Sequence, residues 1–290
     1  MKGPQPVPTL VCPNCGAQVD IHLPNCPDCR TFVGYPNIRR AEGMRPALEA
    51  NYRAALADAL ARGVSNLVAQ LETLLQGAVA TINVSPKILA SMALDHPYLG
   101  YHHALEQGLR LKAEDIYHAH RLASDAKLHP GYEKDIIYAA LSPDGRGLTG
   151  YGEITLRLRE TIVARRASLL RENAFDFYER YHLGERDATE EPGWRAVWAD
   201  RALLGIAQLE PLLTTALSAA ALPALALSVG ATRHDDQFIE VHVFDPISAQ
   251  GLDSVSLDQA LTDVDARDEW DFAQNRLARR GVAVMDNTTP

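Results

Sequence analysis

Residues 235–248 alternate apolar and polar side chains in the manner of a strand. Apolar residues dominate positions 238–244, a proline at 246 closes the segment with a turn, and Glu240 stands in the middle. Glutamate is depleted in strands, so a carboxylate in this position requires an explanation. Two interpretations are open: Glu240 faces solvent on an edge strand, or it faces a cleft and takes part in chemistry.

Helical patterns dominate the first third of the chain. Apolar residues recur at steps of three and four over residues 41–80, which predicts one long helix packed on its own domain. A dimerising coiled coil is the alternative, although no ladder of charged residues accompanies the apolar stripe. Ser85 and Pro86 form an N-cap and a first-turn proline, and they start a helix that runs to about residue 94. Residues 39–95 are therefore expected to form a helical spacer.

From residue 96 onward, short strands and helices follow one another, which predicts an α+β domain over residues 96–290. The turn signals and apolar runs predict helices over 98–110 and 113–120 and strands over 136–141 and 151–158. Further expectations are a strand or turn over 162–170, a helix over 194–221 broken near 211, a strand over 224–229, partly helical segments over 253–261 and 270–280, and a last strand over 281–284.

Composition and charge narrow the class of protein. The 290 residues are 47% hydrophobic and 22% charged, with a net charge of −9, which disfavours electrostatic binding of nucleic acid by the whole chain. The N-terminus lacks the apolar core of a signal peptide, so a cytoplasmic protein is expected. The uncharged stretch 211–229 approaches the length of a membrane span, but Pro223 interrupts it. A buried helix followed by a strand is the preferred interpretation.

All four cysteines lie within residues 12–29 as two CPxC motifs. Four thiolates at this spacing can surround one tetrahedral ion, while the turn amides donate to the sulfurs. This pattern indicates a metal site in a reducing compartment, with redox dithiols as the alternative. The sequence predicts a structural zinc ribbon over residues 1–38, which docks on a protein, caps the fold or contacts nucleic acid. The predicted ligands are Cys12, Cys15, Cys26 and Cys29.

Four segments of the large domain occur in a distinctive order. They are RLASD at 121–125, YAALSP at 138–143, YGEITLRL with ARRASLLRENAF within 151–175, and FIEVHVFDPIS at 238–248. Together they resemble the arginine–serine–glutamate plan of bacterial mono-ADP-ribosyltransferase toxin domains, over about residues 96–286. The chain departs from that plan where Phe244-Asp245 replaces the common glycine and where Ser168 lacks flanking hydroxyl residues.

The resemblance implies a split antiparallel sheet and the transfer of ADP-ribose from NAD to a macromolecular acceptor. It implies that Glu240 and Ser168 are catalytic, with Glu240 activating the acceptor and Ser168 bracing the nicotinamide ribose, and that Arg121 holds the NAD phosphates or ribose. Tyr138 and Tyr151 are candidates for an aromatic wall against nicotinamide. The residue types suit the reaction, because a carboxylate stabilises an oxocarbenium-like transition state and a guanidinium binds phosphate.

The sequence leaves the roles of two sets of histidines open. His118 or His120 could replace Arg121 in a histidine–tyrosine–glutamate variant of the plan. His242 lies two residues from Glu240 and therefore on the same strand face, where it tunes the carboxylate or, as we expect, only lines a groove wall.

Two other classes of function compete with the transferase. One is a zinc-ribbon adaptor whose large domain has lost its chemistry, which the weak serine motif favours. The other is a metal-dependent hydrolase that uses the histidine-rich stretch 96–129, although no HExxH motif is present. A transferase of this type is expected to act as a toxin or as an effector in phage defence or infection. A toxin requires an immunity protein or antitoxin as a partner, and the identity of the acceptor stays open.

Overall fold

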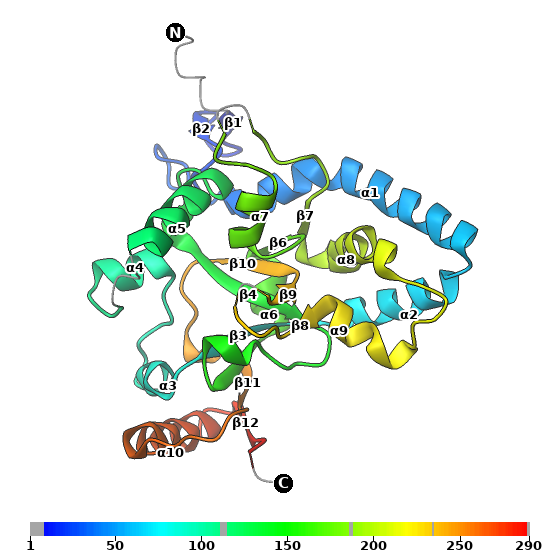
Figure 1. Cartoon of the computed structure of the whole chain (residues 1–290). Coiled ribbons are helices and arrows are strands. Elements are labelled where there is room, and N and C mark those ends of the chain that lie inside the picture. Colours follow the sequence, from blue (N-terminus) through cyan, green and yellow to red (C-terminus); the bar gives the residue numbers. More distant parts are fainter. Residues whose placement is uncertain (1–8, 111–114, 186–187, 234, 289–290) are drawn as a thin grey trace.

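The computed structural model describes residues 9–110, 115–185, 188–233 and 235–288 (Figure 1). Its centre is an eight-stranded sheet in the order β12-β11-β5-β3-β4-β10-β6-β7. Neighbouring strands are antiparallel except for the parallel pair β11–β12. The strands are β3 (Val79–Val84), β4 (Ile136–Ser142), β5 (Ile154–Leu158), β6 (Ala167–Leu170), β7 (Arg195–Val197), β10 (Glu240–Phe244), β11 (Leu252–Leu257) and β12 (Ala283–Asp286).

Helices and two small hairpins surround this sheet, and the expected α+β class is confirmed. The helices are α1 (Pro36–Arg62), α2 (Ser65–Gln76), α3 (Pro86–Ala93), α4 (Tyr101–Glu106), α5 (Asp115–Leu128), α6 (Glu160–Arg166), α7 (Ala174–Arg180), α8 (Arg201–Leu209), α9 (Leu222–Ala226) and α10 (Val264–Ala278). The hairpins are β1 (Thr9–Val11) with β2 (Gln18–Asp20), and β8 (Leu227–Ser228) with β9 (Gln237–Phe238). Of the helix expected over 113–120, residues 113–114 lie outside the described residues.

Strand β3 joins the two halves of the sheet. Residues 79–81 of this strand pair with β4, whereas residues 81–84 pair with β5. The segment expected to be a helical spacer therefore supplies a central strand, so its helices pack as part of the large domain.

A single helix over 41–80 is a wrong prediction, because glycines end both helical pieces. Gly63 takes the left-handed conformation with φ +72° and caps α1, and Gly77 is the C-cap of α2, two residues before β3 begins.

Several strands and turns also differ from the sequence pattern. The segment 253–261, expected to be partly helical, forms β11, because its residues pair on one side with β5 and on the other with β12. The segment 162–170 divides into the end of α6 and the buried strand β6. The expected helix over 194–221 begins as strand β7 and is helical mainly in α8. Within the described part of the chain, no helix has the length and apolarity that crossing a membrane requires.

The three strands β4, β10 and β6 have two different faces. On one face, alternate residues such as Ala139, Val241 and Leu169 belong to the main apolar core, together with side chains from α1, α2, α8 and α10. The other face carries Tyr138, His242 and Ser168 in one register row, with Glu240 two residues along β10. This polar face is the one on which the candidate site is built.

Candidate active site around Glu240

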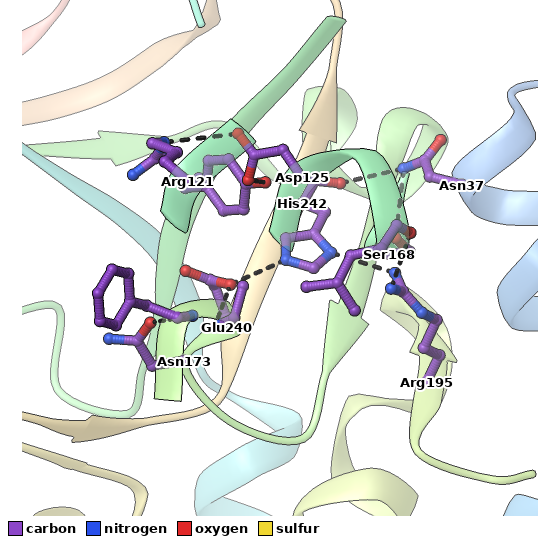
Figure 2. A network of polar contacts seen from close by, with 12 residues as sticks. Asn37, Arg121, Asp125, Ser168, Asn173, Arg195, Glu240 and His242 are labelled. Atoms are coloured by element: carbon purple, nitrogen blue, oxygen red, sulfur yellow. Dashed lines mark hydrogen bonds and ion pairs between the residues drawn. The ribbon is translucent and has the colours of Figure 1, made fainter. Parts of the chain in front are cut away.

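Glu240 lies on a central strand rather than on a solvent-facing edge. Strand β10 is paired on both sides, and the glutamate is only 6% exposed. One carboxylate oxygen, Oε2, accepts hydrogen bonds from the backbone N–H of Ala174 (2.9 Å) and from His242 Nε2 (2.9 Å; Figure 2). Burial raises the pKa of Glu240 to about 8, against the lowering effect of the Ala174 amide. The solvent-facing interpretation is therefore wrong.

His242 is hydrogen-bonded to this carboxylate, so the expectation that it only lines a groove wall is also wrong. Its other ring nitrogen, Nδ1, lies 3.4 Å from Nη1 of Arg195. A guanidinium can only donate, so Nδ1 accepts and Nε2 carries the proton that is donated to Glu240. Burial holds the pKa of His242 well below its usual value, which keeps the ring neutral. Among the described residues, the second oxygen of Glu240, Oε1, has no hydrogen-bond partner.

Arg195 is a neighbour of His242 that the sequence reasoning missed. It is fully buried on β7, and its charge is neutralised by Glu190, with Nε 2.9 Å from Oε2 and Nη2 2.6 Å from Oε1. Arg40 adds a second contact to Glu190 at 3.1 Å, and both arginines donate to the carbonyl of Leu128. The sequence signal was an arginine in the short apolar segment between Trp194 and Trp198. An arginine buried in such a segment requires a partner of opposite charge.

Ser168 lies beside this network but out of reach of solvent. It faces His242 across the β6–β10 pair and is fully buried. Its hydroxyl lies 3.4 Å from Nδ2 of Asn37, a residue of the first turn of α1. The structure thus brings Ser168 and Glu240 to the same sheet face on neighbouring strands.

Arg121 and Tyr138 meet at Asp125, above the same sheet face. The hydroxyl of Tyr138 donates to Asp125 Oδ1 (2.6 Å), and Nε of Arg121 lies 3.5 Å from Oδ2 of the same carboxylate. The guanidinium lies 4.6 Å from the centre of the Tyr138 ring. The Arg121 side chain is 35% exposed, and its charge lowers the pKa of Glu240. Arg121, Tyr138 and Glu240 therefore share one electrostatic environment.

Tyr151 lies at the rim of this site. It is 40% exposed, and the guanidinium of Arg233 lies over its ring at 4.9 Å. Burial raises the pKa of Tyr151 to about 12, and the charge of Glu240 contributes to that rise. No hydrogen bond joins Tyr151 to Glu240 within the described residues.

Arg110 is a second arginine that the sequence reasoning missed. Together with Arg121 and Arg233 it forms a group of cationic side chains that we call the arginine rim. It lies over the ring of Tyr101 at 5.1 Å, and Arg121 lies at the same distance from that ring. The charges of Arg121 and Arg233 lower the pKa of Arg110, after the larger effect of burial. Among the described residues, neither Arg110 nor Arg233 forms an ion pair with a carboxylate. Three arginines at one rim form a place where an anion would be stabilised.

The two histidines proposed as replacements for Arg121 have other contacts. His118 Nδ1 lies 2.8 Å from the hydroxyl of Tyr101. The ring of His120 packs on that of Phe175 at 3.7 Å, and its Nε2 lies 3.1 Å from a carboxylate oxygen of Glu179.

The four cysteines of segment 12–29 lie together as predicted. Their sulfurs are all within 4.8 Å of one another, and the pairs Cys12–Cys29 and Cys15–Cys26 are each 3.6 Å apart. A tetrahedral ion with metal–sulfur bonds of about 2.3 Å would place sulfurs roughly 3.8 Å apart, so the donor set fits a metal ion. Within the described residues, which include 96–110 and 115–129 of the histidine-rich stretch, no other group of histidine, cysteine or carboxylate side chains gathers in this way.

A cavity of about 450 Å³ lies away from Glu240. It is formed between α1, α8 and the segment before β7, and its lining includes Asn51, Arg171, Trp194 and Gln208 but not Glu240.

No protein-family model matches the sequence, and a search of curated proteins finds no significant relative.

Proposed function

We propose that this protein is a mono-ADP-ribosyltransferase that transfers ADP-ribose from NAD to a macromolecular acceptor. The observation that carries the proposal is Glu240, a buried carboxylate in the middle of the sheet with a pKa of about 8 and one oxygen that has no hydrogen-bond partner among the described residues. Such a group is adjusted for acid–base chemistry near neutral pH, and cationic and aromatic side chains surround it.

The reaction breaks the bond between C1′ of the ribose and the nicotinamide nitrogen. The bonding electron pair leaves with nicotinamide, which leaves an oxocarbenium-like centre on the ribose. The ionised Glu240 stabilises this positive charge through Oε1, and it accepts the proton that the acceptor nucleophile loses when it attacks C1′. His242 and the Ala174 amide hold Oε2, so the carboxylate stays oriented throughout.

The rim supplies the groups that a dinucleotide requires. Arg121, Arg110 and Arg233 would bind the pyrophosphate, because guanidinium groups form paired, charge-assisted hydrogen bonds with phosphate oxygens. Tyr138 and Tyr151 would stack against nicotinamide or its ribose. In this assignment Ser168 supports the strand beside Glu240 and contacts NAD only if the site rearranges, because its hydroxyl is buried.

The four-cysteine cluster would hold a structural zinc ion. Four cysteine ligands leave no open coordination position, so the ion would stabilise the ribbon without taking part in the transfer.

A second candidate is a binding protein with an inactive transferase-like domain. Two observations favour it: Ser168 is fully buried, and the 450 Å³ cavity lies away from Glu240. A protein of this type would bind no NAD. It would contact partners through the ribbon or through the arginine rim.

The test is nicotinamide release from NAD, measured by chromatography, together with calorimetry of NAD binding. The wild-type chain is expected to release nicotinamide. Glu240→Gln is expected to release it about 100-fold more slowly, or slower still, while NAD binding is retained. The exposed control Glu185→Gln is expected to behave as wild type. Equal, negligible release by wild type and Glu240→Gln in the presence of bound NAD would refute the transferase. Absence of any NAD binding would favour the binding protein.

A further inference from the structure

The cysteine ribbon is fastened to the first turn of α1 through one arginine. Arg39 donates from Nη1 to the carbonyl of Val33 (2.9 Å) and from Nη2 to that of Leu23 (2.9 Å), with further hydrogen bonds to the carbonyls of Gly34 and Ile21. These carbonyls belong to the segments that flank the second CPxC turn. The position of the α1 N-terminus therefore depends on the folded shape of the ribbon.

Asn37, two residues earlier, links the same turn of α1 to the strand of Glu240 (Figure 2). It is fully buried, and its Nδ2 donates to the carbonyls of His242 (3.0 Å) and Arg166 (2.9 Å). The same nitrogen lies 3.4 Å from Oγ of Ser168. A single side-chain amide thus holds β10 and β6 together directly beside the hydrogen bond from His242 to Glu240.

An aromatic chain forms a second connection between ribbon and site. The ring of His22 in the ribbon lies 6.0 Å from that of Tyr132, which lies 5.5 Å from His129. His129 in turn stands nearly perpendicular to His242 at 4.5 Å. Gly131 lies beside the His22 ring, and its φ of +81° is the left-handed conformation that favours glycine.

Several polar atoms between the two sites have no hydrogen-bond partner in the described part of the chain. They are both ring nitrogens of His129, the hydroxyl of Tyr132 and Oδ1 of Asn37, all buried. Unpaired buried polar groups disfavour the arrangement that contains them, so this arrangement persists only because its surroundings hold it. The ribbon is one of those surroundings.

We propose that Asn37 and Arg39 are positioning residues, and that the metal-bound ribbon uses them to hold the β10 strand in the geometry Glu240 requires. The apolar core of the ribbon is small, with Cys12, Val19 and Cys26 as its buried members. Such a ribbon keeps its fold only with a bound ion. Loss of the ion would release the acceptors of Arg39 and loosen Asn37. The effect on rate rests on the proposed transferase function, whereas the coupling itself does not.

The experiment is hydrogen–deuterium exchange of the full chain, read by mass spectrometry with zinc bound, after chelation and after zinc is restored. Chelation is expected to speed exchange about tenfold or more in peptides covering 166–170 and 240–244, and zinc to reverse it. The far strand β11, residues 252–257, is expected to stay protected. Asn37→Ala and Arg39→Ala are expected to reproduce the effect with zinc bound, and Arg53→Ala, exposed on α1, to leave exchange unchanged.

Two outcomes would overturn the coupling. If chelation changes exchange only within residues 9–34, the ribbon is an independent appendage. If β11 loses protection as much as β10, the metal supports the whole fold rather than this strand. Activity gives a separate readout: if the transferase exists, Asn37→Ala is expected to lower kcat for nicotinamide release with little change in KM for NAD. Failure of that assay alone would count against the proposed function and leave the exchange result standing.

Discussion

The buried pair Arg195–Glu190 gives the sharpest prediction about stability. In the variant Glu190→Gln the volume is preserved, but the negative charge that neutralises a fully buried guanidinium is lost. The side chain of Glu190 is 4% exposed and that of Arg195 is inaccessible, so water cannot replace the lost charge. Breaking one side of such a pair costs about 3–5 kcal/mol, because the remaining charge is left buried without compensation. We expect the free energy of unfolding to fall by that amount.

Urea unfolding followed by tryptophan fluorescence measures this loss, with Glu106→Gln as the matched control. Glu106 pairs with Lys134, and both side chains are about half exposed, so that change is expected to cost at most about 1 kcal/mol. Removing both charges with Glu190→Met and Arg195→Met is expected to recover most of the stability lost in the single variant. Equal effects of the Glu190 and Glu106 variants would refute the reasoning, because burial would then not decide the strength of the pair.

Three further predictions concern Glu240 and its rim. The pKa of Glu240 is raised from 4.5 to about 8 in the folded chain, so the folded state binds a proton that the unfolded state has lost. The free energy of unfolding is therefore expected to fall as pH rises from about 5 to 8, by up to roughly 5 kcal/mol. Urea titrations at several pH values measure this dependence, and Glu240→Gln should flatten it. If the transferase proposal holds, the rate of nicotinamide release should rise with pH through about 8, because the carboxylate is the active form, and a flat profile would contradict the role of Glu240. Arg110→Gln and Arg233→Gln should each weaken NAD binding about tenfold by calorimetry with little loss of stability, and unchanged affinity would remove these residues from the site.

The elements with strong local signals were predictable from the sequence. The cysteine cluster follows from ligand spacing, α3 from its first-turn proline, and the β10 strand from its alternation. Helix α10 was recognised in part. In each case a few neighbouring residues contain the whole physical reason for the structure.

Several of the remaining errors have a common cause, which is that tertiary pairing decides the outcome. Residues 79 and 80, which the apolar pattern places at the end of a helix, belong to a strand because β4 and β5 pair with β3 on its two sides. The polar run of β11 is stabilised as a strand by two neighbours that are distant in sequence. The site follows the same rule: Arg195, Asp125 and Asn37 acquire their roles only from side chains that the fold brings to them.

The polar face beneath α5 and α7 is hard to explain by stability alone. A buried glutamate with a raised pKa, a neutral histidine and an arginine–glutamate pair occupy positions where apolar side chains would pack at least as well. Two donors fix Oε2 and Oε1 has no partner in the described residues, so the carboxyl group of Glu240 is held in one orientation. The arginines above it stand against aromatic rings, and two of them have no carboxylate partner in the described chain. An anion bound at the rim would stabilise these arginines, which is why we propose a phosphate-bearing substrate there.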